Sequence, residues 1–219
     1  MKPYYEEESG IIYCGDSFEV IPQLQFSDKV VCVTDPDYNA TDIGRYHREY
    51  DNGMFHLPAD EYKSWCEKWF LLVNKITPNM LFTPGIRNIW NYPQAKWVIA
   101  WHKPGSTCFN GTGGFNIWEP VLLYGNVGPF SEDHISRVPN NLLKDITRKH
   151  PCPKTYPVWQ WLINKGVKPG YEVIDIFGGS GTTALACKKL GIKYTLIEKS
   201  EKYCQIAVER LRQSVMVLS

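Results

Sequence analysis

Apolar residues gather in seven short runs along the chain, with polar or amphipathic stretches between them. An unbroken apolar run of strand length is typical of a central strand in a sheet covered on both faces. Strands that alternate with helical patterns predict an α/β fold with a doubly wound, mostly parallel sheet. We expect strands at 11–14, 29–34, 80–83, 96–101, 119–125, 173–176 and 194–197, and the main helices at 60–75, 158–165, 184–190 and 203–212.

The length of 219 residues suits one domain, so we predict that 1–219 is a single domain. The formal net charge of +1 gives no overall basic field, and a nucleic-acid partner would need a local patch. Seven scattered cysteines without a C-x-x-C pair favour free thiols in a reducing cytoplasm. Five histidines without ligand spacing indicate no bound metal, and no apolar run approaches the roughly 18 residues of a membrane span.

A glycine-rich stretch, Phe-Gly-Gly-Ser-Gly-Thr-Thr at 177–183, follows one apolar run and precedes a helical pattern. Its small residues let the backbone approach a ligand closely, and the amides of a helix start favour a negative group. Glu198 ends the next apolar run, where an acidic residue can accept hydrogen bonds from ribose hydroxyls. This half of the chain therefore predicts a site for a nucleoside cofactor, without saying which one.

A second strand end carries Asp35-Pro36-Asp37-Tyr38. Asp35 can accept one N–H of an exocyclic amine and the Pro36 carbonyl the other, while Tyr38 stacks on the heterocycle. Such an amine is a poor nucleophile, and two fixed acceptors orient its lone pair. Taken alone, an Asp-Pro-x-Tyr pattern is more typical of a turn after a strand followed by a packed tyrosine, and its company in this sequence favours the amine site.

Together these motifs resemble the beta group of amino-directed DNA methyltransferases. Residues 35–38 are similar to the Asp-Pro-Pro-Tyr catalytic motif, and residues 177–183 to the S-adenosylmethionine loop. The catalytic motif comes first here, which is the circularly permuted order of that group. Further similar segments are Gly15-Asp16-Ser17, Trp101-His102-Lys103-Pro104, 150–155, Ile197-Glu198 and Tyr203-Cys204.

The resemblance implies a seven-stranded, circularly permuted S-adenosylmethionine-dependent fold that flips a base out of DNA and methylates its amine. An Asp at the first motif position favours adenine N6 over cytosine N4. The catalytic residues implied are Asp35, Pro36, Asp37 and Tyr38. The cofactor-binding residues implied are Asp16, Ser17, Asp35, Lys154, Thr155, Asp175, Phe177, Gly178, Gly179, Ser180, Gly181, Thr182, Thr183, Glu198 and Lys199.

The target-recognition segment would fall at 126–149 and is short, which indicates a short site or modest selectivity. The residues expected to contact DNA are Arg45, His47, Arg48, Lys144, Arg148 and Lys149. The resemblance also allows a homodimer and places the enzyme in the cytoplasm of a bacterial or phage-infected cell, in restriction–modification or in a phage.

The chain departs from the family pattern at several prolines. Asp37 replaces the second proline of the catalytic motif and adds a charge that can repel Asp35 or raise its pKa. Ile176 and Thr155 replace two others. The alternatives left open are an RNA or protein-amide methyltransferase, a weakly active or inactive cofactor-binding relative, a nicotinamide-dependent oxidoreductase and a non-catalytic DNA-binding module.

Overall fold

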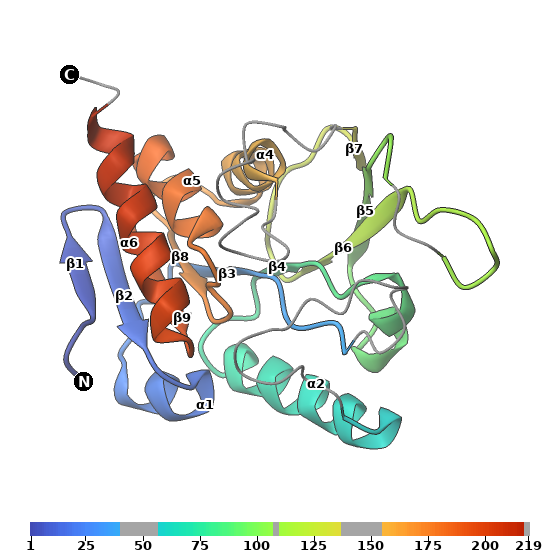
Figure 1. The fold of residues 1–219 in the computed structure, drawn as a ribbon, viewed down its shortest axis with the longest axis horizontal. Helices are drawn as coiled ribbons and strands as arrows, with labels where there is room; N and C mark the ends of the chain where they lie inside the picture. The colour runs from blue at the N-terminus through green and yellow to red at the C-terminus, as the bar shows by residue number, and fades with distance from the viewer. Residues whose placement is uncertain (40–56, 107–109, 137–154, 217–219) are drawn as a thin grey trace.

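A computed structural model of the protein describes residues 1–39, 57–106, 110–136 and 155–216. These residues form one sheet in the order β1-β2-β9-β8-β3-β4-β6-β5-β7, with helices packed on both faces (Figure 1). The strands are β1 (Tyr5–Glu7), β2 (Gly10–Cys14), β3 (Val30–Thr34), β4 (Met80–Phe82), β5 (Trp97–His102), β6 (Trp118–Tyr124), β7 (His134–Ser136), β8 (Glu172–Asp175) and β9 (Tyr194–Glu198).

Most neighbouring strands are parallel, as the sequence predicted. β2, β9, β8, β3 and β4 run the same way, and β6 lies antiparallel between β4 and β5. All seven predicted strands are present, but the sheet built by the described ranges has nine. The two extra strands, β1 and β7, are three-residue edge strands, and β1 consists of Tyr-Glu-Glu. Neither contains an apolar run, because an edge strand is covered on few sides.

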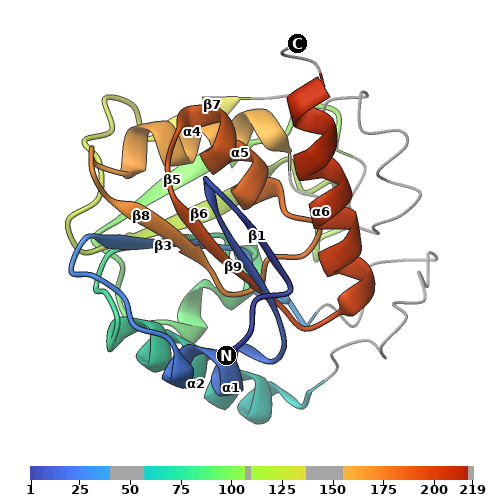
Figure 2. The same ribbon diagram turned by 90° about the vertical axis from the view of Figure 1, so that its left-hand side faces the viewer.

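Helices cover the two faces of the sheet in separate layers (Figure 2). On one face lie α4 (Tyr156–Gly166), α5 (Thr182–Leu190) and α6 (Glu201–Met216). On the other lie α1 (Ser17–Val20), extended by the 3-10 turn η1 (Ile21–Gln23), and α2 (Ala59–Asn74). A further 3-10 helix, η2 (Ile86–Asn91), follows β4. The segment Ser17–Gln23 is therefore one α-turn followed by one 3-10 turn.

The side chains of β3 show why its apolar run is unbroken. Val31 and Val33 belong to the core cluster beneath α4, α5 and α6, which includes Trp159. Val30 and Cys32 belong to the cluster beneath α1 and α2. Successive strand residues point to opposite faces, so a strand covered on both sides buries every residue.

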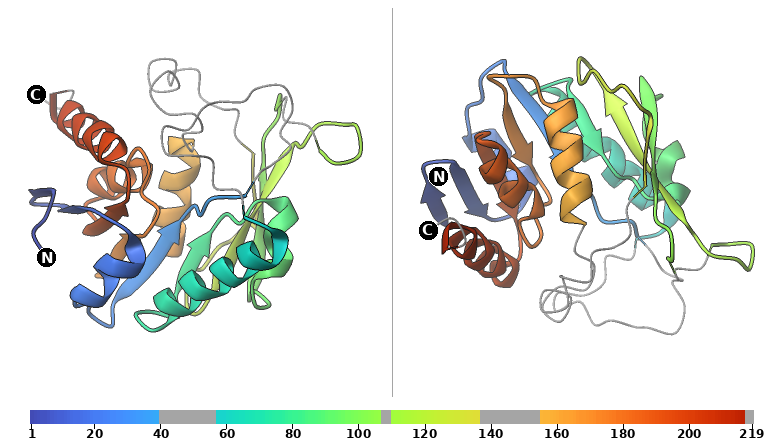
Figure 3. Two further views of the ribbon diagram at one scale, coloured as in Figure 1. Left: turned by 60° about the horizontal axis from the view of Figure 1, so that its bottom comes forward. Right: turned by 90° about the horizontal axis from the view of Figure 1, so that it is seen from above.

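The chain reverses its direction of winding between β8 and β3, which pair in parallel. From β8 it passes through α5 to β9 on one side, and from β3 through α2 to β4 on the other. Ligands bind beyond the carboxyl ends of the strands at such a switch point. The views of Figure 3 show α2 and α5 on opposite sides of these two strands.

Within the described ranges no helix is long and apolar enough to cross a membrane.

Candidate functional site

Residues from distant parts of the sequence meet at the carboxyl edge of the parallel strands. Asp35 directly follows β3, and Asp175 is the last residue of the neighbouring strand β8. Glu198 ends β9, on the other side of β8. The structure thus brings together the two motifs that the sequence placed at separate strand ends.

Asp175 ties this edge together. Its buried carboxylate accepts hydrogen bonds from Thr34 Oγ1 at 2.6 Å, from Thr183 Oγ1 at 2.5 Å and from the Phe177 N–H at 3.1 Å. Trp159 Nε1 donates to Thr183 Oγ1 at 2.8 Å, which extends the network to α4. Burial raises the pKa of Asp175 to about 6, although the three hydrogen bonds oppose the shift. Asp175 and Thr183 therefore fix the path of the glycine-rich loop.

The glycine-rich loop packs closely against β9 and α6. A Cβ on Gly178 would lie 2.3 Å from the Leu196 side chain. Gly181 has φ +78°, and a Cβ there would lie 2.6 Å from the Cβ of Ala207. Only glycine satisfies both the space and the left-handed backbone at Gly181. The tight packing holds the loop directly over the start of α5.

A buried arginine that the sequence did not single out holds this loop from α6. Arg210 Nη1 donates to the Ser180 carbonyl at 2.5 Å, to Ser180 Oγ at 3.0 Å and to Thr182 Oγ1 at 3.2 Å. The residue is 6% exposed, and burial lowers its pKa to about 10. The predicted loop residues Ser180 and Thr182 are thus oriented by a cation behind the loop.

Glu198 and the residues after β2 close the cofactor side. Glu198 accepts from the Gly179 N–H and the Ser200 N–H, both at 2.7 Å, and burial raises its pKa. Each carboxylate oxygen can accept a second hydrogen bond, which is the capacity that ribose hydroxyls require. Asp16 caps α1 through the Phe18 N–H at 3.0 Å and pairs with Lys199 at 3.0 Å.

Three further predicted cofactor residues are buried or half-buried and contact other parts of the protein. Ser17 is buried and donates to the Ile176 carbonyl. Phe177 is half-buried, with its ring centroid 5.3 Å from that of Trp65 on α2. Thr155 is buried at the N-cap of α4.

Asp35 and Tyr38 are hydrogen-bonded to each other within the candidate catalytic motif. Asp35 Oδ1 accepts from the Tyr38 hydroxyl at 2.7 Å and from Thr83 Oγ1, and Pro36 is buried. Asp37 is exposed, and its Oδ1 accepts from the Asn39 N–H at 2.8 Å. The Asp37 carboxylate therefore takes part in the turn after the motif, which is the local role typical of Asp in loops.

Sequence reasoning assigned no role to two charged residues beside this motif, although it named the segment that contains Lys103. Glu119, near the start of β6, is buried and accepts from the Tyr38 hydroxyl and from Lys103 Nζ, the latter at 2.7 Å. Lys103 directly follows β5. The available signal was topological: β6 is antiparallel, so its first residues lie where the parallel strands end. Burial, followed by the charges of Asp35 and Glu119, raises the pKa of Tyr38 well above its usual value.

The predicted DNA-contacting residues lie outside the described residues, as does Lys154; they are Arg45, His47, Arg48, Lys144, Arg148 and Lys149. Of the expected recognition segment, residues 126–136 are described and include β7. In the part of the chain that the structure describes, no group of three or more His, Cys, Asp or Glu residues could hold a metal ion.

Comparison with known proteins gives consistent similarities over nearly the whole chain. A family model for N6 and N4 methyltransferases, described as DNA methylase, matches residues 83–209. The type II methyltransferase HinfI of Haemophilus influenzae is 36% identical over 255 residues, covering 97% of this chain and 71% of the relative. The type II methyltransferase ScaI of Streptomyces caespitosus is 26% identical over 278 residues, covering 99% and 86%.

Solved structures share the fold. The cytosine-N4-specific PvuII DNA methyltransferase superposes with a TM-score of 0.72 at 19% identity, over 95% of this chain and 88% of that one. The complex of M1.HpyAVI with S-adenosylmethionine gives a TM-score of 0.67 at 24% identity, over 91% and 98%.

Proposed function

The chain belongs to the DNA methylase family of N6 and N4 amino-methyltransferases, and we propose that it methylates the N6 amine of a flipped adenine in DNA, with S-adenosylmethionine as methyl donor. The observation that carries the proposal is the adjacency of β3 and β8 at the switch point. Because of this adjacency, Asp35 and Pro36, which are expected to bind the amine, lie beside the glycine-rich loop. The choice of adenine rests on Asp35 at the first position of the motif.

The residues of the cofactor side fit S-adenosylmethionine. Gly178 and Gly181 have no room for a side chain against Leu196 and Ala207, so the loop backbone lies close to β9 and α6 and keeps a fixed path. Glu198 retains acceptor capacity for ribose hydroxyls, and the loop leads into the N-terminus of α5. When bound, the cofactor supplies a methyl group on a positively charged sulfur.

The catalytic motif supplies orientation. Asp35 and the Pro36 carbonyl accept the two N–H groups of the target amine, so that its lone pair is directed away from both. Tyr38 offers a ring for the flipped base, whose unstacking costs a few kcal/mol. The recognition role of 126–149, the single domain 1–219 and a homodimer remain proposals. So do the phosphate contacts, which are assigned to Arg45, Arg48, Lys144, Arg148 and Lys149.

Base analysis of product DNA tests the proposal. Purified protein is incubated with labelled S-adenosylmethionine and unmethylated DNA, RNA or a protein extract, and the nucleosides of the product are separated. We expect label in DNA as N6-methyladenine. N4-methylcytosine would overturn the choice of base, and label confined to RNA or protein would overturn the substrate class.

A pair of variants at opposite ends of β3 tests whether methylation requires Asp35. Asp35→Ala removes the amine acceptor at the carboxyl end of β3, and we expect at least a hundredfold loss of methylation. Asp28→Ala changes an exposed residue before the amino end of β3 and serves as the control, with wild-type activity. Equal activities of the two variants would contradict the assignment of the motif.

A further inference from the structure

One phenolic hydroxyl lies between two carboxylates in the candidate catalytic site. The Tyr38 hydroxyl is within hydrogen-bond distance of Asp35 Oδ1, at 2.7 Å, and of Glu119 Oε1. A hydroxyl carries a single proton and can donate fully to one acceptor at a time. The same hydrogen bond can therefore pass from Asp35 to Glu119 without the ring leaving its place.

The surroundings keep this hydroxyl protonated and place a cation beside Glu119. Burial and the two carboxylates raise the pKa of Tyr38, so it remains a donor at neutral pH. Lys103 Nζ lies 2.7 Å from Glu119 Oε2 and 5.5 Å from the centroid of the Trp101 ring. The lysine offsets the charge of a carboxylate that is only 5% exposed.

We infer that Glu119 is a positioning residue for methyl transfer, acting through Tyr38. When the target amine approaches Asp35, it competes with the Tyr38 hydroxyl for Oδ1. Glu119 accepts that hydroxyl in exchange, which releases Asp35 for the amine and holds the Tyr38 ring as the stacking surface. The inference rests on the proposed function, because it requires an amine that binds Asp35.

Two double variants isolate the acceptor from the buried charges. Lys103→Met/Glu119→Gln removes both charges but leaves an amide oxygen that can accept from Tyr38. Lys103→Met/Glu119→Met removes the same charges and the acceptor, with side chains of similar length. We expect the glutamine variant to methylate DNA within about threefold of wild type. We expect the methionine variant to lose roughly tenfold or more in kcat, because the Tyr38 hydroxyl then keeps Asp35 as its acceptor and competes with the target amine for Oδ1.

The same pair in a Tyr38→Phe background separates positioning from general damage. Without the hydroxyl, Glu119 has nothing to accept from Tyr38, so both double variants should match Tyr38→Phe alone within about twofold. S-adenosylmethionine affinity, measured by calorimetry, should stay unchanged throughout. If the methionine variant does not fold, Glu119→Asp serves instead, because it moves the acceptor away from Tyr38 by one methylene. We expect a smaller loss of kcat in this variant. In the Tyr38→Phe background, Glu119→Asp should cause no further loss.

Equal kcat values for the glutamine and methionine variants, or a difference that persists in the Tyr38→Phe background, would overturn the inference alone. A wild-type protein that methylates no DNA would reject the proposed function and this inference with it.

Discussion

The Asp175 carboxylate shows how a single buried residue can hold two strand ends and the loop of the site together. It is 4% exposed and is bonded to side chains from β3 and α5 and to the backbone of the loop. An ionised carboxylate loses hydration when it is buried, and the hydrogen bonds recover only part of that loss. The raised pKa of Asp175 therefore shows that holding the loop with an ionised carboxylate costs the folded protein free energy.

That cost predicts a pH dependence of stability. Between about pH 4 and 6 the folded protein binds the Asp175 proton more tightly than the unfolded chain, since the pKa rises from 3.8 to about 6 on folding. Stability due to this group is therefore highest below pH 4 and falls as pH rises through this window, by about 2–3 kcal/mol. Asp175→Asn removes the titration.

The measurement is the difference in unfolding free energy between wild type and Asp175→Asn from pH 4 to 7. We expect the free energy of unfolding of the wild type to fall relative to that of the variant as pH rises to about 6. Above pH 6 the difference should become constant. A difference that is independent of pH would show that Asp175 has an ordinary pKa in the folded protein.

Some site residues could be predicted from sequence and others could not, for a physical reason. Asp35, Glu198 and the loop glycines lie directly after apolar runs, so local pattern places them at strand ends. Glu119, Lys103 and Arg210 gain their meaning from partners on other strands or helices. Local periodicity carries no information about such pairings. The assigned roles of the motif residues, Asp37 included, remain predictions.

At the level of elements, the glycine-rich loop is defined by what packs behind it. α6 comes close enough for Ala207 to occupy the space of a side chain at Gly181, and Arg210 binds the loop carbonyl. The strand, loop and helix were predictable because each has its own pattern. β1 and β7 were missed because short edge strands need no apolar run. The circular permutation likewise remains a prediction.

Two glycines that flank α5 make a matched pair of substitutions. Gly181 and Gly191 both have positive φ, +78° and +67°, but a Cβ at Gly191 meets nothing within 4 Å. Gly191→Ala should cost only the backbone strain, about 1 kcal/mol. Gly181→Ala adds overlap with Ala207 and should cost about 2–4 kcal/mol in total.

Chemical denaturation gives the two stabilities, and calorimetry gives the cofactor affinity. Only Gly181→Ala should weaken S-adenosylmethionine binding, by roughly tenfold, since the loop must shift to relieve the overlap. Equal losses in both variants would mean that α6 does not constrain the loop.

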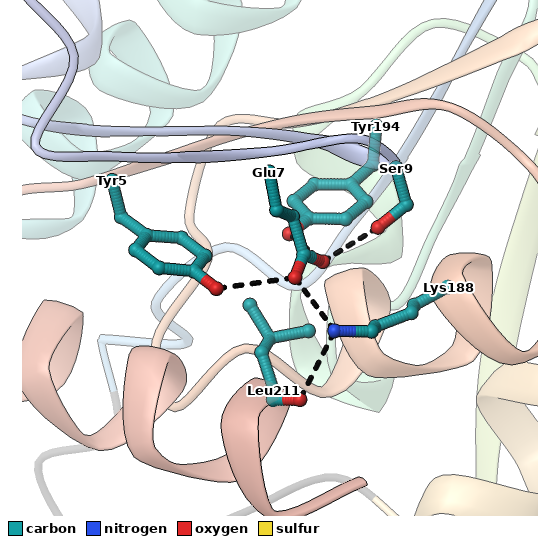
Figure 4. A network of polar contacts seen from close by, with 6 residues as sticks. All are labelled: Tyr5, Glu7, Ser9, Lys188, Tyr194 and Leu211. Atoms are coloured by element: carbon teal, nitrogen blue, oxygen red, sulfur yellow. Dashed lines mark hydrogen bonds and ion pairs between the residues drawn. The ribbon is translucent and has the colours of Figure 1, made fainter. Parts of the chain in front are cut away.

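At the scale of the whole molecule, the carboxylate of Glu7 connects the N-terminal strand β1 to the C-terminal half of the chain. Glu7 on β1 accepts from Tyr5, Ser9, Tyr194 and Lys188, and Lys188 Nζ also donates to the Leu211 carbonyl on α6 (Figure 4). The strand itself is three residues long and lies at the sheet edge. We therefore expect its attachment to depend on these side chains as well as on its ladder.

Glu7→Gln tests this attachment while leaving the site untouched. Burial acts to raise the pKa of Glu7, but hydrogen bonds from Lys188, Ser9 and Tyr194 lower it overall. A lowered pKa means that the carboxylate stabilises the fold above the unfolded value of about 4.3, and that this stability is lost as pH falls through the folded pKa.

The side chains of Glu7 and Lys188 are both mostly buried, so we expect Glu7→Gln to lower the free energy of unfolding by about 2 kcal/mol at pH 7. Unfolding of wild type and variant should differ by this amount at pH 7 and converge only when the pH falls below the lowered pKa of Glu7 in the folded protein, with equal methylation per folded molecule. A variant that is as stable as wild type at pH 7 would show that the backbone ladder alone holds β1.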